Sequence, residues 1–108
     1  MMIVTTIEHI SGYDIEEILG LVIGNIVHSK HLGKDIAAAF KTLAGGEIRS
    51  YTEMMTEARN KALERMIDEA EKLGADAVLG VRFGSSAVMS GAAEMLAYGT
   101  AVKLRKKE

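Results

Sequence analysis

The chain has 108 residues, of which 48% are hydrophobic and 26% charged, with a net charge of −2 and no cysteine. A chain of this length is expected to form one domain, residues 1–108, with a substantial core. The lack of cysteine excludes disulfides, thiolate nucleophiles, iron–sulfur clusters and thiolate zinc sites, and the charge gives no general attraction to nucleic acid.

The N-terminal stretch "MMIVTTIEHI" has neither the basic region nor the small-residue cleavage site of an export signal. No apolar run approaches the roughly 20 residues that a membrane span needs. We therefore expect a cytoplasmic protein that does not insert into membranes. The basic tail "KLRKKE" is expected to be a solvated end, with a phosphate contact as the alternative.

The first third of the chain predicts a short strand at residues 3–7, a turn at "SGYD" and a longer strand at residues 18–27. Gly20 and Gly24 interrupt the second strand. Glycine inside a strand usually marks a bulge, a bend or another backbone passing close by. We therefore expect a strongly coiled sheet.

Two helices are predicted next. The shorter spans residues 35–44 with Asp35 as its N-cap, and the longer spans residues 51–73, where Ser50 and Glu53 form a capping box. Glycine ends each helix. The long helix carries apolar residues at spacings of three and four, which predicts one buried face. These residues are Tyr51, Met54, Met55, Ala58, Ala62, Met66, Ala70 and Leu73.

Two alternating strands complete the chain. In "ADAVLGVRF" one face carries Ala77, Leu79, Val81 and Phe83. In "EMLAYGTAVKL" the expected core face comprises Leu96, Tyr98, Thr100, Val102 and Leu104, and the opposite face comprises Met95, Ala97, Gly99 and Ala101. The intervening "GSSAVMSG" predicts a hairpin tip. The order of elements predicts an α+β domain with a small antiparallel sheet, one long helix and one short helix on one face.

This arrangement has a consequence for assembly. One long helix cannot cover both sides of a sheet, so the face with Ala97 and Ala101 needs a partner. Open edges at both ends of a four-stranded sheet also invite pairing, and a closed ring removes them. We expect a cyclic homo-oligomer, with a monomer as the alternative.

A set of different short motifs is spread along nearly the whole chain. They are Thr5-Thr6, Gly24, Asp35, Gly45-Gly46, Tyr51, Ala58-Arg59, Ala62, "LGADAVLGV" at 73–81 and "GTAV" at 99–102. This combination resembles the YbjQ-like proteins, an uncharacterised family labelled "putative heavy-metal-binding". The resemblance implies a small α+β fold assembled as a homopentameric ring around a strand-built centre, with no established activity. Asn25 and Glu47 depart from the family pattern, which commonly has an acid and an arginine there.

The stretch "NIVHSKHLG" carries His28 and His31, the candidate metal ligands. This spacing puts both rings on one side in a helix or turn, but not in an extended strand. A divalent transition metal usually takes three or four ligands, so His9, Asp35, Glu47 or a neighbouring subunit would have to complete the site. The alternative is two solvent-exposed histidines in a loop, and the sequence requires no cofactor.

Other reactive side chains have simpler interpretations. The thioethers of Met54, Met55, Met66, Met89 and Met95 are copper(I) ligands in principle, but the helical spacing of the first three predicts core packing. Ser85, Ser86 and Ser90 lack a nucleophile-elbow pattern. The loop "LAGGEIRS" offers an anion site at a helix N-terminus, without a phosphate-loop motif.

We therefore predict a non-enzymatic oligomeric module with a binding or structural role and a nominal heavy-metal-binding function. Its expected partner is itself, with a metal ion or a small ligand as a further one. The alternative is a ring that binds a small ligand or an anion at its subunit seams, and a true enzyme ranks third.

Overall fold

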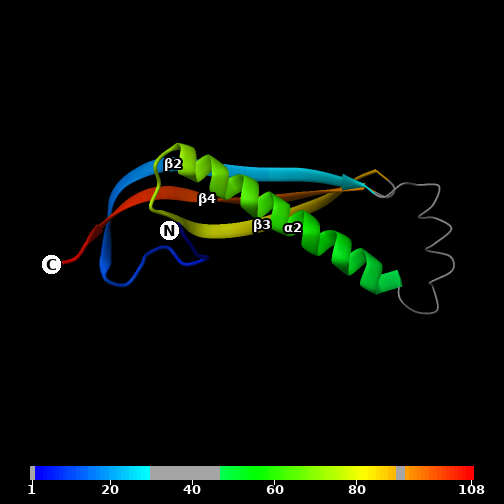
Figure 1. Ribbon diagram of the computed structural model, residues 1–108, viewed down its shortest axis with the longest axis horizontal. Coiled ribbons are helices and arrows are strands. Elements are labelled where there is room, and N and C mark those ends of the chain that lie inside the picture. Colours follow the sequence, from blue (N-terminus) through cyan, green and yellow to red (C-terminus); the bar gives the residue numbers. More distant parts are fainter. Residues whose placement is uncertain (1, 30–46, 90–91) are drawn as a thin grey trace.

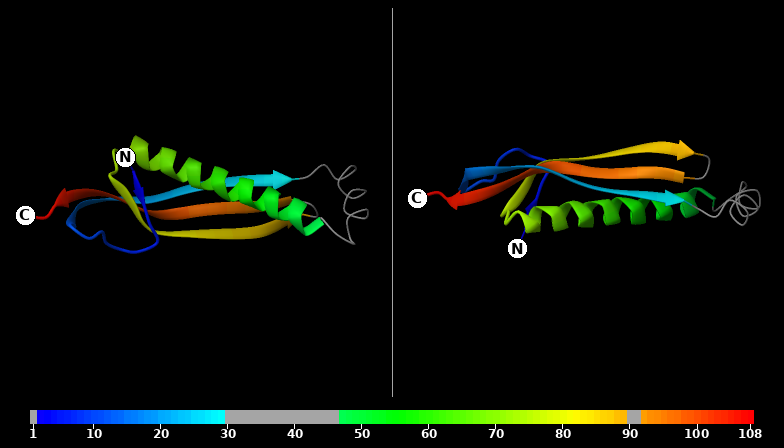
Figure 2. Two further views of the ribbon diagram at one scale, coloured as in Figure 1. Left: turned by 60° about the horizontal axis from the view of Figure 1, so that its bottom comes forward. Right: turned by 90° about the horizontal axis from the view of Figure 1, so that it is seen from above.

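The computed structural model describes residues 2–29, 47–89 and 92–108. Its elements are β1 (Ile3–Val4), β2 (Tyr13–Ser29), α2 (Glu47–Lys72), β3 (Ala77–Met89) and β4 (Ala92–Lys106). The long helix lies across one face of a long, narrow sheet, which gives two layers (Figures 1 and 2). The short helix predicted at residues 35–44 lies outside the described residues. Within the described residues, no helix is both long and apolar enough to cross a membrane.

The sheet has four strands in the order β1-β3-β4-β2. β2 and β3 each pair antiparallel with β4, whereas β1 pairs parallel with the start of β3 through Ile3 and Val4. The expected α+β class is confirmed, but the sheet is mixed and not purely antiparallel. Parallel pairing needs a crossover connection, and here the chain between β1 and β3 supplies it by way of β2 and α2.

The central pair of strands is longer than the sequence predicts. Ser85 pairs with Met95, Ser86 with Glu94 and Ala87 with Ala93, so β3 continues to Met89. The predicted hairpin tip at "GSSAVMSG" is therefore wrong for residues 84–89. Serine and glycine favour turns locally, but pairing with the neighbouring β4 decides the conformation here.

α2 keeps most of its predicted buried stripe and begins earlier, but Leu73, a predicted member of this stripe, follows the helix and is 47% exposed. The side chains of Met54, Ala58, Ala62, Met66 and Ala70 are buried. The helix ends where Gly74 adopts φ +76° and the Ala75 N–H donates to the Ala70 carbonyl at 3.1 Å, as expected for a glycine stop. Because the helix begins at Glu47, Ser50 lies inside its first turn, and the predicted Ser50 cap is wrong.

The helix covers the face of the sheet that carries small residues, so the predicted core face is wrong for the part of β4 beneath the helix. Val102, on the predicted face, is nevertheless buried in a second cluster with Leu79 and Ala77. Met95, Ala97 and Ala101 of β4 are buried against the helix, whereas Tyr98 is 38% exposed on the other side. The cause is close approach. A Cβ atom on Gly24 would overlap backbone atoms of Ala62 and Met66 in α2, which confirms the expectation that a backbone passes close to a strand glycine.

In the middle of β3, the alternation of side chains between the two faces of the sheet is shifted by one residue. Its register with β4 shifts between Leu79 and Arg82, and Gly80 adopts φ +62° at this bulge. As a result Val81 joins Val78 in the core beneath the helix, while Leu79 packs in a separate cluster with Ala77, Val102 and the N-terminal residues Ile3 and Ile10. The expected common face of Leu79 and Val81 is therefore wrong. A second shift, between Ile18 and Gly20 in β2, confirms the expected bulging at strand glycines.

Candidate functional site

The predicted metal ligands lie at and beyond the end of β2. The backbone of His28 pairs with Ala93 in β4, and His31 lies outside the described residues. His9, one of the additional donors considered, is exposed in the loop after β1. The described residues contain no group of three or more His, Asp or Glu side chains that could hold a metal ion. The described part of the chain therefore offers no set of side chains suited to hold a metal. The His28–His31 site stays a prediction.

Among the residues that the structure describes, the other reactive side chains do not come together in one site. Met54, Met66 and Met95 are buried in the core, which confirms the packing interpretation for the two helix methionines, and Met89 is 65% exposed. Ser85 and Ser86 are exposed residues of β3, and Ser90 lies outside the described residues, as do residues 43–46 of the predicted anion loop.

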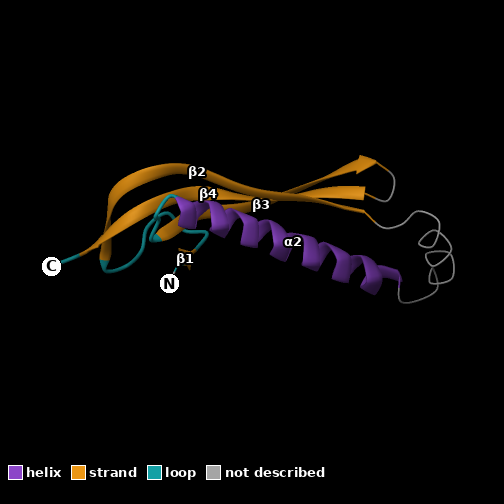
Figure 3. Cartoon of the chain, turned by 45° about the horizontal axis from the view of Figure 1, so that its top comes forward, coloured by secondary structure: helices purple, strands orange, loops and turns teal. Residues whose placement is uncertain are grey.

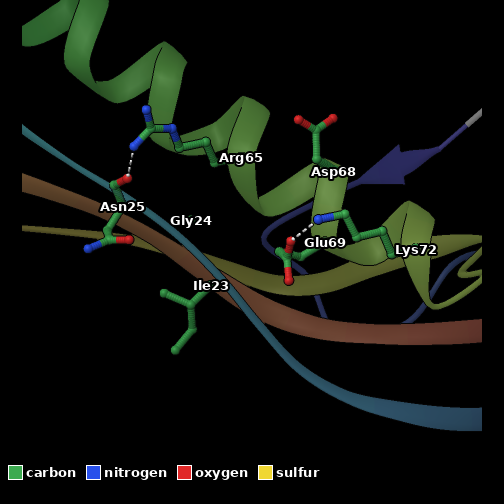
Figure 4. Close-up of a pocket in the computed structure, with 7 residues that line it drawn as sticks. All are labelled: Ile23, Gly24, Asn25, Arg65, Asp68, Glu69 and Lys72. Carbon is green, nitrogen blue, oxygen red and sulfur yellow. Dashed lines mark hydrogen bonds and ion pairs between the residues drawn. The ribbon is translucent and has the colours of Figure 1, made fainter.

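A groove of about 330 Å³ lies between β2 and α2. Figure 4 shows its seven lining residues, which are Ile23, Gly24, Asn25, Arg65, Asp68, Glu69 and Lys72. The groove exists because α2 rests on Gly24, so charged residues on the flank of the helix overhang the strand. Arg65 Nη1 donates a hydrogen bond of 2.8 Å to the Asn25 carbonyl, and Ile23 points away from the helix.

The charges of this groove largely compensate one another. Lys72 Nζ lies 2.9 Å from Glu69 Oε2 in an exposed ion pair. The hydrogen bond and the negative charge of Glu69 raise the pKa of the Lys72 ammonium above its usual value. Arg65 and Asp68 also line the groove, which thus carries two cationic and two anionic side chains. The groove therefore has no net charge to attract an anion or a metal, and its distinctive feature is an exposed strand edge.

The surroundings of Asn25 favour an amide over an acid at this position. The Asn25 Nδ2 atom lies 3.3 Å from Glu94 Oε2 on the neighbouring strand and donates to it. An ionised acid at position 25 could only accept hydrogen bonds and would repel Glu94. The amide is therefore compatible with Glu94 where a carboxylate is not.

The N-terminal residues Ile3 and Ile10 cover one end of the sheet face opposite α2, and the rest of this face carries large apolar side chains that remain exposed within the described residues. We call this exposed part the open face and define it by Ile18, Leu21, Ile23, Val27 and Tyr98. These side chains are 68%, 64%, 46%, 58% and 38% exposed, respectively. Figure 3 shows the sheet with the helix on one side of it. Sequence reasoning missed this surface because large apolar residues on an alternating strand usually indicate the core face.

A hollow of about 290 Å³ lies at the end of the open face nearest the N-terminal loop. It is lined by Glu8, Ile15, Ile18, Leu79, Gly80, Thr100 and Val102. Glu8 is the one ionisable side chain among these residues, so the hollow is suited to apolar atoms.

Comparison with known proteins gives the family. A family model described as "Putative heavy-metal-binding" matches residues 2–105. A UPF0145 protein of Thermosipho africanus is 82% identical over 105 residues, which cover 97% of each chain. The UPF0145 protein of Thermotoga maritima is 74% identical over 105 residues, covering 97% of this chain and 99% of the relative. That of Vibrio campbellii is 58% identical over 103 residues, covering 95% and 99%.

The chain is also similar in fold to a solved structure. The solved structure is that of a protein with unknown function of the DUF74 family from Pediococcus pentosaceus, with a TM-score of 0.60 over 96% of this chain and 98% of that one. At 19% identity this likeness shows the fold alone. The sequence matches carry the assignment and confirm the resemblance. The chain belongs to the UPF0145 family of YbjQ-like proteins, for which no specific biochemical role is established.

Proposed function

We propose that the chain is a self-assembling, non-enzymatic module of the cytoplasm, with a binding or structural role as a ring of identical subunits. Five copies is the number implied by the family resemblance. The observation that carries the proposal is the open face. Monomeric soluble proteins rarely expose a contiguous apolar patch larger than a few hundred Å². A surface with Leu21 64% and Ile18 68% exposed is better explained as a contact between subunits.

The dimensions of the chain also favour assembly. Its radius of gyration is 17.8 Å and its extents are 60 × 22 × 19 Å, whereas a compact domain of about 100 residues has a radius of about 13 Å. Its accessible surface is 7278 Å², against about 5,800 Å² for a compact monomer of this mass. A thin, elongated subunit of this kind gains a larger core by packing against copies of itself.

The charge pattern suggests how the subunits are oriented. The outer side of α2 carries exposed charged residues, among them Glu53, Glu57, Lys61, Glu64 and Glu71. A charged helix side favours water, and the apolar open face favours burial. We therefore place the open faces toward the ring axis and the helices outside, which gives a strand-built centre.

The proposal is tested by native mass spectrometry and analytical ultracentrifugation at micromolar concentration. The wild type should be a pentamer. A Leu21→Asp variant should dissociate to monomers, because assembly would bury an unpaired charge. Asn60→Asp is the matched control, since it adds the same charge on the exposed side of α2 and should leave the assembly intact. A monomeric wild type, or a Leu21→Asp variant that assembles normally, overturns the proposal.

The hollow beside Ile18 and Leu79 favours a second function, the binding of a small apolar ligand within the ring. A ligand that binds the folded state and not the unfolded one stabilises it by RT ln(1 + L/Kd), where L is the free ligand concentration, and so raises the melting temperature as its concentration increases. Thermal unfolding should therefore shift upward with small apolar molecules at a fixed protein concentration. An Ile18→Asp variant should lose this shift, and a shift that survives the substitution excludes the hollow as the site.

A further inference from the structure

β2 forms a free edge of the sheet. Within the described residues, β4 is its strand partner, and the other side of β2 faces no strand. In an antiparallel ladder, alternate residues direct their backbone groups to the same side. The Asn25 carbonyl points away from β4, toward Arg65, so Leu21, Ile23 and Val27 present their backbone groups to the same free edge. Such an edge is a template for pairing with another chain.

Arg65 binds a backbone carbonyl in the middle of this free edge. Its Nη1 atom lies 2.8 Å from the Asn25 carbonyl oxygen, where an incoming strand would place a backbone N–H. The position is fixed by the helix contact, because Met66, the next residue of α2, lies directly over Gly24. The Arg65 side chain also lines the groove that an added strand would fill (Figure 4).

The remainder of the edge is also interrupted. The β2–β4 register shifts between Ile15 and Glu17 and again between Ile18 and Gly20, where Gly20 has φ +124°. Bulges of this kind twist an edge and hinder strand addition. The regular ladder therefore covers residues 20–29, and Arg65 binds in the middle of it.

The opposite edge of the sheet is guarded only at its start, where Arg82 Nη1 donates to the Val81 carbonyl at 2.9 Å and to the Thr6 carbonyl at 3.0 Å, and within the described residues no comparable contact reaches residues 83–89. β1 pairs with β3 at Ala77 and Val78, and the Thr5 carbonyl accepts from Val81, but residues 83–89 have no strand on that side within the described part of the chain. This stretch, "FGSSAVM", carries no charged residue. Its lack of charged or proline gatekeepers makes it the segment of a second copy best suited to pair with β2.

We propose that Arg65 is an autoinhibitory guard of the β2 edge, which accepts residues 83–89 of a second copy as an added strand once Arg65 releases the Asn25 carbonyl. The inference rests on the proposed self-association and adds the contact that controls it. The guard keeps the single chain from pairing at random through its longest exposed edge. Each pairing event then replaces one side-chain hydrogen bond with a ladder of backbone hydrogen bonds.

The test compares Arg65→Ala, Arg65→Lys and the control Arg59→Ala, which removes the same charge from an exposed position of α2. Sedimentation over a range of concentrations gives the association constant, and hydrogen exchange reports the amides of residues 21–27. Arg65→Ala should raise the association constant about two- to tenfold, the equivalent of one lost competing hydrogen bond. The amides of residues 21–27 should become protected at lower protein concentration than in the wild type.

Arg65→Lys retains a cationic donor and should restore most of the wild-type behaviour, whereas Arg59→Ala should not differ from the wild type. If the hydrogen bond from Arg65 to Asn25 only stabilises the fold, Arg65→Ala should lower the melting temperature and leave association unchanged or weaker. That result overturns the guard. Should Arg65→Ala fail to fold, Arg65→Gln preserves the aliphatic stem and is measured in the same way.

The outcomes separate the two proposals. An oligomeric wild type whose association is insensitive to Arg65→Ala overturns the guard and leaves the ring intact. A monomeric wild type whose Arg65→Ala variant associates through residues 21–27 overturns the ring and supports the guard.

Discussion

Gly24 in β2 lies directly beneath Ala62 in α2, so closely that a methyl group on Gly24 would overlap the Ala62 carbonyl oxygen. Small side chains of both layers, Ala58, Ala97 and Ala101, are buried in the same core cluster, so helix and sheet can approach closely here. This contact explains why the long helix selects the face of the sheet that looks least like a core. It also fixes the residues that overhang the β2 edge.

Replacing Gly24 with alanine should therefore destabilise the fold. The new methyl group meets backbone atoms, which cannot rotate away, so the helix must shift. We expect a loss of about 2–3 kcal/mol in the free energy of unfolding, or about 10–20 °C in Tm. Thermal unfolding followed by circular dichroism measures the effect.

Gly84→Ala is the matched control for this prediction. Its Cβ would meet no heavy atom closer than the Leu96 side chain at 3.8 Å, so the change should stay within about 0.5 kcal/mol. Equal effects of the two substitutions would show that the helix contact at Gly24 is not the cause.

Asp76 fixes the connection between α2 and β3. Its Oδ2 atom accepts a hydrogen bond of 2.8 Å from the Leu104 N–H, and its own N–H donates to the Val102 carbonyl at 2.9 Å. Asp76→Ala removes the first of these and should cost about 1 kcal/mol in chemical denaturation. Glu71→Ala, at an exposed helix position, should have little effect. If Asp76→Ala is equally neutral, the carboxylate contributes nothing to this connection.

The ion pair of Lys72 with Glu69 has a defined pH dependence. Because Glu69 raises the pKa of Lys72 in the folded state, the pair stabilises the protein below the ordinary lysine pKa and loses this effect as the pH rises through the raised value. NMR titration should show a higher pKa for Lys72 in the wild type than in Glu69→Gln. Glu71→Gln serves as control and should leave the Lys72 titration unchanged, so a pKa insensitive to Glu69 would contradict the assignment.

The histidine pair gives the direct test of the family's metal label. If His28 and His31 bind a divalent transition metal, natively purified protein should contain stoichiometric zinc, nickel or copper by elemental analysis. A His28→Ala/His31→Ala double variant should lose it, whereas His9→Ala tests whether the exposed N-terminal histidine takes part. Negligible metal in the wild type, or full metal content in the double variant, rules the pair out.

Periodicity predicted the elements well and their packing less well. The buried stripe of α2 and the strand positions follow from residue spacing, and Gly24 correctly signalled a close backbone. The choice of core face on β4 failed because both of its faces are apolar, and alternation cannot say whether Tyr98 or Ala97 faces the helix. The decisive quantity is the distance between the layers, which small residues on both elements set together.

The groove could not be predicted from either of its halves. Asn25 and Arg65 are 40 residues apart, and nothing local in the sequence relates an asparagine on one strand to an arginine on the helix. The signal that could have located it is the combination of Gly24 with the Ala58–Ala62–Met66 stripe, since a glycine and a small-residue helix face indicate where the two backbones meet. Arg65 then follows as the neighbour of the contact residue Met66.

The bulge at Gly80 has a consequence for how the length of β3 can vary. Two residues of β3, Gly80 and Val81, stand opposite the single residue Gly99 of β4, so β3 has one extra residue at this point. Deleting Gly80 would leave Val78, Leu79 and Val81 on the sides of the sheet that they occupy now. Deleting a residue between 82 and 86 would instead invert every side chain from there to the next irregularity. Natural length differences within this strand should therefore collect at position 80.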